Sequence, residues 1–196
     1  GEKGSEVKLG IKRHGTTELQ YFSVVRGDIP VVSVDAYFMK DKHTGYIHVK
    51  NFGEQTYAEM LVALANLNMK GMDLRGNQGG YMHVAIQMVN EFLPANRLIV
   101  YTEGRKSPRE EFHSDGRGTF QNLPIVVLVD EFSASASEIF AGAIQDNDRG
   151  TIVGRRTFGK GLVQQPMNFR DGSVVRLTVT RYYTPSGRCI QKPYEK

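Results

Sequence analysis

Residues 124–130 read Pro124-Ile125-Val126-Val127-Leu128-Val129-Asp130, an apolar run that ends on its one charged residue. A continuous run rich in valine is typical of a strand buried on both faces, as in a sheet covered by helices. A short loop follows, and then a helix is predicted from about Ser135 to Asp146. A buried strand, a short loop and a helix form the unit from which α/β folds are built, so this segment predicts that class.

Helices and loops are also predicted outside this unit. One helix is expected from Tyr57, where Thr56 and Glu59 form a capping box, and another after Gly79-Gly80 as far as Pro94. Residues 103–119 are rich in Gly, Ser, Pro and charge, so they are expected to form a mobile surface loop.

Short apolar or alternating segments predict the strands. Asp171-Gly172 is typical of a hairpin turn, here between residues 163–169 and 173–182. Strands and helices alternate through the middle and a β-rich stretch closes the chain, which predicts an α/β fold with a mixed sheet flanked by helices. Further strands are predicted at residues 7–11, 19–25, 31–34, 45–50, 98–101 and 151–154.

The composition excludes several classes of protein. The chain has 196 residues, 40% of them apolar and 23% charged, which suits one sizeable globular domain with a small appendage. Its formal net charge of +4 is spread along the chain, so no nucleic-acid partner is expected. One cysteine and five histidines without ligand spacing predict neither a disulfide nor a metal or other cofactor. The first residue is not methionine and no signal peptide is present, so we interpret the chain as part of a longer protein.

Ser135 is the first candidate for chemistry. It stands three residues before Glu138, the spacing of a capping box, which places it at the head of the predicted helix. A serine there lies at the positive end of the helix dipole, and the N–H of Ala136 could face an oxyanion formed by its attack on a carbonyl. The plain alternative is that Ser135 only caps the helix, because serine is a common N-cap.

Lys160 is the candidate base, because a serine hydroxyl needs one and no histidine stands in a recognisable triad motif. Gly159 and Gly161 flank it and allow the chain to bend there. Its pKa would have to fall from about 10.4 towards 7 or 8, at a cost of about 3–5 kcal/mol. Burial among Phe158, Leu162 and Val163 is expected to lower it. The alternative is an exposed turn lysine.

Three blocks of sequence, read together, resemble a known family. Residues 73–80 read Asp-Leu-Arg-Gly-Asn-Gln-Gly-Gly, residues 133–138 Ser-Ala-Ser-Ala-Ser-Glu, and residues 157–164 Thr-Phe-Gly-Lys-Gly-Leu-Val-Gln. They resemble, in order, the signatures of the carboxyl-terminal processing (tail-specific) proteases, peptidase family S41. The separation of 25 residues between Ser135 and Lys160 is also that of the family.

The resemblance implies roles for individual residues. Ser135 would be the nucleophile, Lys160 the general base, and Gln164 the residue that positions the lysine amine. The oxyanion hole would be formed by the N–H of Ala136 and that of a glycine in the pair Gly79-Gly80. The implied core fold is similar to the ClpP/crotonase type, with residues 14–196 as the catalytic core and residues 1–13 as the end of an N-terminal PDZ domain.

The implied function is that of a serine endopeptidase without a cofactor, which cleaves protein or peptide substrates with unstructured C-termini through an acyl-enzyme. The implied location is the bacterial periplasm or cell envelope, where peripheral association and an oligomeric state fit the resemblance. The alternatives are a non-catalytic binding module on the same fold and a crotonase-like acyl-CoA enzyme. The joint presence of Ser135, Lys160 and Gln164 favours the protease.

One segment departs from the family pattern. Members have a full apolar strand before the Asp-Leu-Arg motif, whereas only Met69-Lys70-Gly71-Met72 precedes Asp73 here. Either the chain lacks residues at this point, or its central strand is built differently.

Overall fold

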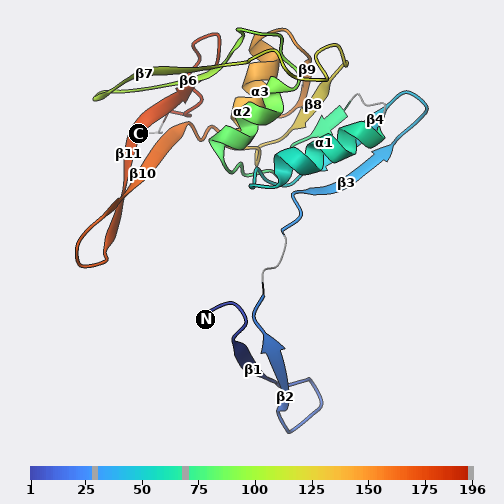
Figure 1. Ribbon diagram of the computed structural model, residues 1–196, viewed down its shortest axis with the longest axis vertical. Coiled ribbons are helices and arrows are strands. Elements are labelled where there is room, and N and C mark those ends of the chain that lie inside the picture. Colours follow the sequence, from blue (N-terminus) through green and yellow to red (C-terminus); the bar gives the residue numbers. More distant parts are fainter. Residues whose placement is uncertain (28–30, 68–70, 194–196) are drawn as a thin grey trace. The chain divides into compact units, whose positions relative to one another are not determined.

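The structure is a computed structural model that describes residues 1–27, 31–67 and 71–193 (Figure 1). The chain divides into two compact units, Gly1–Val31 and Val32–Lys196. The first unit contains strands β1 (Glu6–Ile11) and β2 (Gln20–Val25), which pair antiparallel. Because β2 pairs with β1, the first unit extends beyond residue 13, where the sequence places the end of its first domain.

The second unit contains a mixed sheet of order β3-β4-β5-β8-β9. Strand β3 (Val34–Met39) runs antiparallel to β4 (Gly45–Val49). From β4 onward each neighbour is parallel, through β5 (Gly71–Asp73), β8 (Val126–Val129) and β9 (Thr151–Gly154). The described helices are α1 (Thr56–Asn66), α2 (Met82–Asn90) and α3 (Ala136–Asp146). This confirms the predicted α/β class with a mixed sheet.

The core lies between the sheet and the helices. Val127 and Val129 of β8 are buried, whereas Val126 and Leu128 are half-buried, so one face of this strand is covered less fully than predicted. Aromatic rings join the helices: Phe140 of α3 meets Phe92 edge-on, with ring centroids 6.1 Å apart. Other core side chains include Ile47, Val49, Met60, Leu64, Met72, Met88, Ile139 and Ile144.

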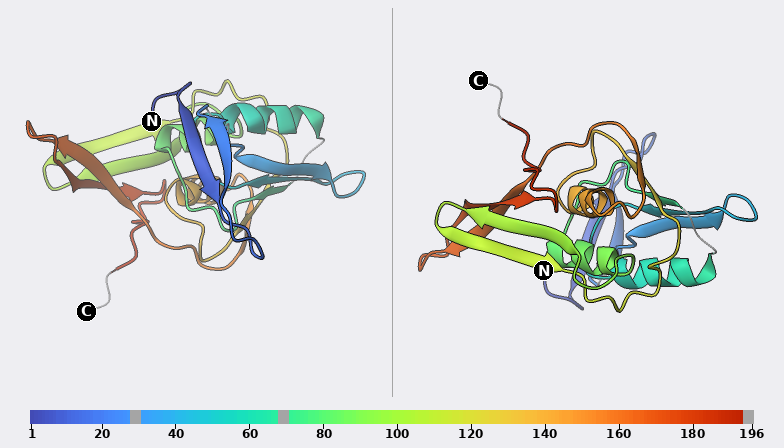
Figure 2. Two further views of the ribbon diagram at one scale, coloured as in Figure 1. Left: turned by 90° about the horizontal axis from the view of Figure 1, so that it is seen from below. Right: turned by 90° about the horizontal axis from the view of Figure 1, so that it is seen from above.

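A second sheet has the order β10-β11-β6-β7. Strands β10 (Leu162–Asn168) and β11 (Val174–Tyr183) form an antiparallel hairpin, which confirms the predicted Asp171-Gly172 turn. Within the second unit, the β6–β7 and β10–β11 hairpins lie at one end and the β3–β4 turn at the other (Figure 2).

The prediction of a mobile loop at residues 103–119 is wrong. Strand β6 runs over Leu98–Gly104, and β7 (Ser107–His113) pairs with it as a hairpin. A distant segment stabilises the hairpin, because β11 pairs with the edge of β6 that does not face β7. The Arg109 guanidinium also lies 3.7 Å from the centre of the Tyr101 ring, a cation–π contact across the two strands.

Two other predictions need correction. The strand expected at residues 31–34 begins at Val34 and continues to Met39. Thr56 and Glu59 do not form a capping box; Glu59 Oε2 instead accepts the backbone N–H groups of Ser33 and Val34, at 2.8 and 2.7 Å. The first helical turn therefore fixes the entry into β3. Helix α2 also ends at Asn90, before Pro94.

The segment before Asp73 is a short strand. β5 comprises Gly71–Asp73, between β4 and β8 in the sheet, while Met69 and Lys70 lie outside the described residues. Three residues suffice to pair on both sides, because Met72 aligns with Ile47 on one neighbour and with Val127 on the other. The central strand is therefore short rather than absent.

Candidate active site

The carboxyl ends of the parallel strands meet at one edge of the sheet, where α/β proteins place their ligand sites. Segments following β4, β5, β8 and β9 line a single pocket of about 460 Å³ there. Its lining residues are Lys50, Asn51, Gly76, Gln78, Gly79, Gly80, Ser135 and Lys160. The structure therefore brings Ser135, Lys160 and both candidate glycines to one pocket. Lys50 and Asn51 carry no local sequence signal, and sequence reasoning missed them.

Ser135 occupies a sharp turn between β8 and α3. Its φ of 56° and ψ of −112° lie outside the regions that side-chain-bearing residues favour. Such strain costs about 1–3 kcal/mol and persists only where the surrounding structure enforces it. Strained strand-to-helix turns of this kind present nucleophilic serines in hydrolases. The predicted capping box is present, and Glu138 Oε2 accepts the Ser135 backbone N–H at 2.8 Å.

Gly79 packs directly against this turn. Its φ is +97°, and a Cβ placed there would lie 2.8 Å from the Ser135 Cβ and 2.6 Å from the Ala134 carbonyl oxygen. No residue with a side chain fits at such distances without moving the Ser135 turn. The glycine is therefore required by its contact with the candidate nucleophile.

The backbone N–H groups near Ser135 differ in availability. Gly79 N–H donates to Asn77 Oδ1 at 2.8 Å, and the buried Asn77 side chain donates in turn to Val49 O. Within the described part of the chain, the N–H groups of Gly80 and Ala136 donate to no protein acceptor. These two groups, rather than that of Gly79, are free to bind an oxyanion.

Glu138 joins the loop of Ser135 to that of Lys160. The carboxylate is buried, with 5% of the residue exposed. Besides the Ser135 N–H, Oε2 accepts the Lys160 N–H at 2.8 Å. The other oxygen, Oε1, accepts the Gly159 N–H at 2.6 Å and the Thr157 hydroxyl at 2.8 Å. Sequence spacing identified only the link to Ser135; the link to residues 157–160 depends on tertiary structure.

Asp130, the last residue of the apolar run, holds the neighbouring loops together. Its carboxylate accepts the Gly76 N–H at 2.9 Å and the Phe132 N–H at 3.0 Å. Burial acts to raise the pKa of Asp130, but these hydrogen bonds and those from Ser133 outweigh it, and the pKa is lowered. The charged form therefore fixes the glycine loop to the segment before Ser135.

The Asp-Leu-Arg motif has a structural role at the base of the site. The Asp73 side chain, 2% exposed, pairs with Arg75, whose Nη2 lies 2.6 Å from Oδ2. Tyr46 of β4 donates its hydroxyl to the same carboxylate at 2.6 Å. Burial, followed by this hydrogen bond, raises the pKa of Tyr46 to about 12. The motif thus ties the glycine loop to β4, the strand that precedes Lys50.

Lys160 is exposed, so the expected burial among Phe158, Leu162 and Val163 is wrong. Phe158 is itself 57% exposed, whereas Gly161, the residue after Lys160, is buried. Among the described residues, no hydrogen bond joins Lys160 Nζ to Ser135 Oγ. Gln164 is exposed on β10, next to an irregularity in strand pairing, and does not line the pocket.

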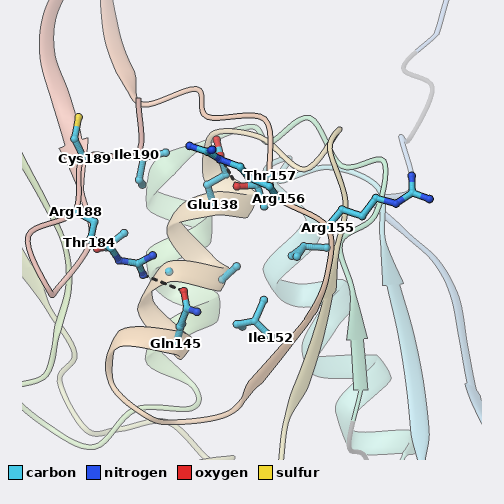
Figure 3. Close-up of a pocket in the computed structure, with 13 residues that line it drawn as sticks. Glu138, Gln145, Ile152, Arg155, Arg156, Thr157, Thr184, Arg188, Cys189 and Ile190 are labelled. Carbon is cyan, nitrogen blue, oxygen red and sulfur yellow. Dashed lines mark hydrogen bonds between the residues drawn. The ribbon is translucent and has the colours of Figure 1, made fainter. Parts of the chain in front are cut away.

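A second cavity of about 300 Å³ lies between α3 and residues 184–190 (Figure 3). Its wall contains the hydrogen bond between Thr157 and Glu138, drawn in Figure 3. Arg188 turns towards Gln145 and donates to it at 2.9 Å, whereas Arg155 points away. Glu138 thus lines this cavity, and its carboxylate binds the backbone N–H groups of Ser135 and Lys160, which line the candidate pocket.

Replacing Glu138 with glutamine tests its positioning role. All groups that Glu138 contacts are donors, so the amide NH2 of glutamine would face N–H groups that then lack an acceptor. We expect a loss of about 2–3 kcal/mol in the free energy of unfolding, measured by urea denaturation. Glu131→Gln, at an exposed position in the loop before Ser135, is the control and should cost less than about 1 kcal/mol. Equal effects of the two changes would contradict the positioning role.

The described residues contain no group of three or more His, Cys, Asp or Glu side chains arranged to hold a metal ion. No helix in the described part of the chain is long and apolar enough to cross a membrane.

Comparison with known proteins gives a consistent result. The model of peptidase family S41 matches residues 43–194. A carboxyl-terminal-processing protease of Synechocystis sp. is 38% identical over 200 residues, which are 98% of this chain and 46% of that protein. The carboxy-terminal processing protease CtpA of Bacillus subtilis is 38% identical over 197 residues, 98% of this chain and 42% of that protein.

A solved structure agrees with these sequence relatives. The photosystem II D1 C-terminal processing protease superposes with a TM-score of 0.74 at 30% identity, covering 97% of this chain and 54% of that chain. The present chain thus spans less than half of the length of the two curated relatives.

Proposed function

Because the chain belongs to peptidase family S41, we propose that it carries the catalytic core of a serine endopeptidase that cleaves protein substrates at or near their C-terminal tails. Ser135 is the nucleophile and Lys160 the general base. The observation that carries the proposal is the strained Ser135 turn, which opens on a pocket lined also by Lys160 and by glycine backbone.

The reaction is an acyl transfer in two halves. Neutral Lys160 Nζ takes the proton of Ser135 Oγ, which attacks the peptide carbonyl. The N–H groups of Ala136 and Gly80 hold the resulting oxyanion. The C–N bond then breaks, and Lys160 returns the proton to the leaving amine. Lys160 next takes a proton from water, which attacks the Ser135 ester, and the proton returns to Ser135 as the acid product leaves.

Because Lys160 is exposed, the bound substrate itself would have to shield the lysine amine from water. A polypeptide lying across the pocket would cover the ammonium and favour its neutral form, since loss of water destabilises the charged form. Gln164 would then act on the lysine amine only after the segment next to the pairing irregularity at Val163 rearranges. The proposal therefore includes a rearrangement of residues 160–164 when substrate binds.

The substrates are proposed to be proteins or peptides with unstructured C-termini, because the names of the relatives refer to processing of carboxyl termini. We place the protein in the bacterial periplasm or cell envelope, with peripheral association and an oligomeric state as further expectations. The end of a PDZ domain at residues 1–13 is likewise proposed on the resemblance.

Incubation with an unstructured polypeptide tests the function. Mass spectrometry of the products should reveal paired fragments whose masses sum to that of the substrate plus one water, with cuts near its C-terminus. A polypeptide that binds but stays intact would instead support the non-catalytic binding module.

A further inference from the structure

Lys50 lines the active-site pocket but has no role in the chemistry described above. Lys50 directly follows β4, and its backbone N–H donates to Ser33 O at 2.8 Å. This hydrogen bond fixes the backbone position from which the Lys50 side chain extends. The side chain is 52% exposed. A second ammonium group is thus anchored at the rim of the pocket.

The pocket presents positive charge and hydrogen-bond donors. Among the described residues, its lining contains Lys50 and Lys160 but no carboxylate. Asn51 Oδ1 already accepts the Ser33 hydroxyl at 2.6 Å and the Gly53 N–H at 3.2 Å, so the amide NH2 is what this side chain offers a ligand. An anionic group of a bound molecule would therefore meet complementary groups.

Lys50 is only weakly paired within the protein. Its Nζ lies 3.7 Å from Asp35 Oδ2, beyond ordinary hydrogen-bond length. The other oxygen of Asp35 contacts His48 Nδ1 at 2.6 Å, so Asp35 keeps a partner if Lys50 turns away. The ammonium can exchange this contact for a ligand carboxylate at little cost.

The strand order separates Lys50 from Ser135. Along the sheet the order is β4, β5, β8, β9, so Lys50, which follows β4, lies on the β4 side of Ser135, which follows β8. Adjacent strands are about 4.8 Å apart, which places the end of β4 about 10 Å from the end of β8. An extended peptide advances about 3.3 Å per residue, so this offset corresponds to about three residues.

We propose that Lys50 is a specificity-determining residue that binds a substrate carboxylate within about three residues of the scissile bond. This inference rests on the proposed protease function, because that function defines the scissile bond. Carboxylate binding, however, can be measured without cleavage. The carboxylate comes either from an acidic side chain or from the free C-terminus of the polypeptide.

Binding of labelled peptides to the Ser135→Ala protein separates these sources. Each peptide is compared with a neutral analogue, Asp with Asn at one position or a free C-terminus with its amide. We expect one acidic member to bind about 3- to 5-fold more tightly, as partly exposed ion pairs allow. This preference should decline as salt rises from about 50 to 500 mM. The pair that shows it identifies the source of the carboxylate.

Substitutions then assign the preference to Lys50. Lys50→Gln should abolish it, Lys50→Glu should reverse it, and Lys50→Arg should retain it. Lys42→Gln is the matched control, because Lys42 is exposed at the opposite end of β4 and should leave the preference in place. In the active protein, Lys50→Gln should raise KM for the acidic peptide and leave kcat within about twofold.

The outcomes are distinguishable. An unchanged preference in Lys50→Gln, or no preference in the Ser135→Ala protein, overturns the inference and leaves the protease function standing. A loss of kcat on acidic and neutral peptides alike also overturns it, because Lys50 would then act in catalysis. If no peptide is cleaved but Lys50→Gln abolishes a measured preference, the carboxylate site stands and the protease function fails.

Discussion

Replacing Ser135 with alanine is expected to lower kcat/KM for an unstructured polypeptide by about 10⁴-fold or more, because removal of a nucleophile leaves only the catalysis that the oxyanion hole and binding supply. The pocket that binds the substrate should persist, because Glu138 Oε2 holds the turn through the Ser135 backbone N–H, a contact that alanine keeps. Initial rates by mass spectrometry measure the loss. Activity within about tenfold of wild type would exclude Ser135 as the nucleophile.

Ser135→Gly is the companion to that variant. It should be equally inactive, yet more stable than Ser135→Ala by about 1 kcal/mol, because glycine adopts a φ of 56° without the strain that a Cβ imposes. Thermal unfolding of the two inactive proteins measures the difference. Equal stability would show that the Ser135 turn is not strained, while leaving the assignment of the nucleophile intact.

Replacing Lys160 with methionine is expected to lower kcat/KM by about 10³-fold or more, because the described residues that line the pocket include no histidine or carboxylate to take its place as base. Stability should change by less than about 0.5 kcal/mol, since the side chain is exposed and Glu138 binds the backbone N–H of residue 160 rather than its amine. A loss of activity in Lys160→Met without a loss of stability would therefore be assigned to proton transfer rather than to misfolding.

Lys160→Arg is the control for charge. Arginine keeps the positive charge but stays protonated at any accessible pH, so it cannot accept the serine proton. We expect it to be as inactive as the methionine variant. Cleavage restored by arginine would mean that position 160 supplies a cation, and the base would have to be sought elsewhere.

The parts of the fold that local patterns determine were predictable. The run before Asp130 and the Ser135–Glu138 spacing gave strand β8, its loop and helix α3, because each depends on residues close in sequence. The β6–β7 hairpin was missed because it depends on pairing with β11 and on the contact between Arg109 and Tyr101. Charge and proline in residues 103–119 are tolerated on an edge strand.

The site shows the same division. Ser135 and Lys160 were found from motifs, whereas Lys50 reaches the pocket only through the register of parallel strands. Glu59 matched a capping pattern, but its carboxylate binds the N–H groups of Ser33 and Val34. The burial predicted for Lys160 failed because hydrophobic neighbours in sequence do not ensure coverage in space.

A serine-directed fluorophosphonate tests the central claim most directly. It esterifies only an activated serine, and digestion followed by mass spectrometry locates the adduct. Ser135 should carry the label in the wild-type protein, with labelling slowed by about 10²-fold or more in Lys160→Met, because the base that activates the hydroxyl is missing. Labelling on another residue, or at an equal rate in Lys160→Met, would contradict the Ser135–Lys160 assignment.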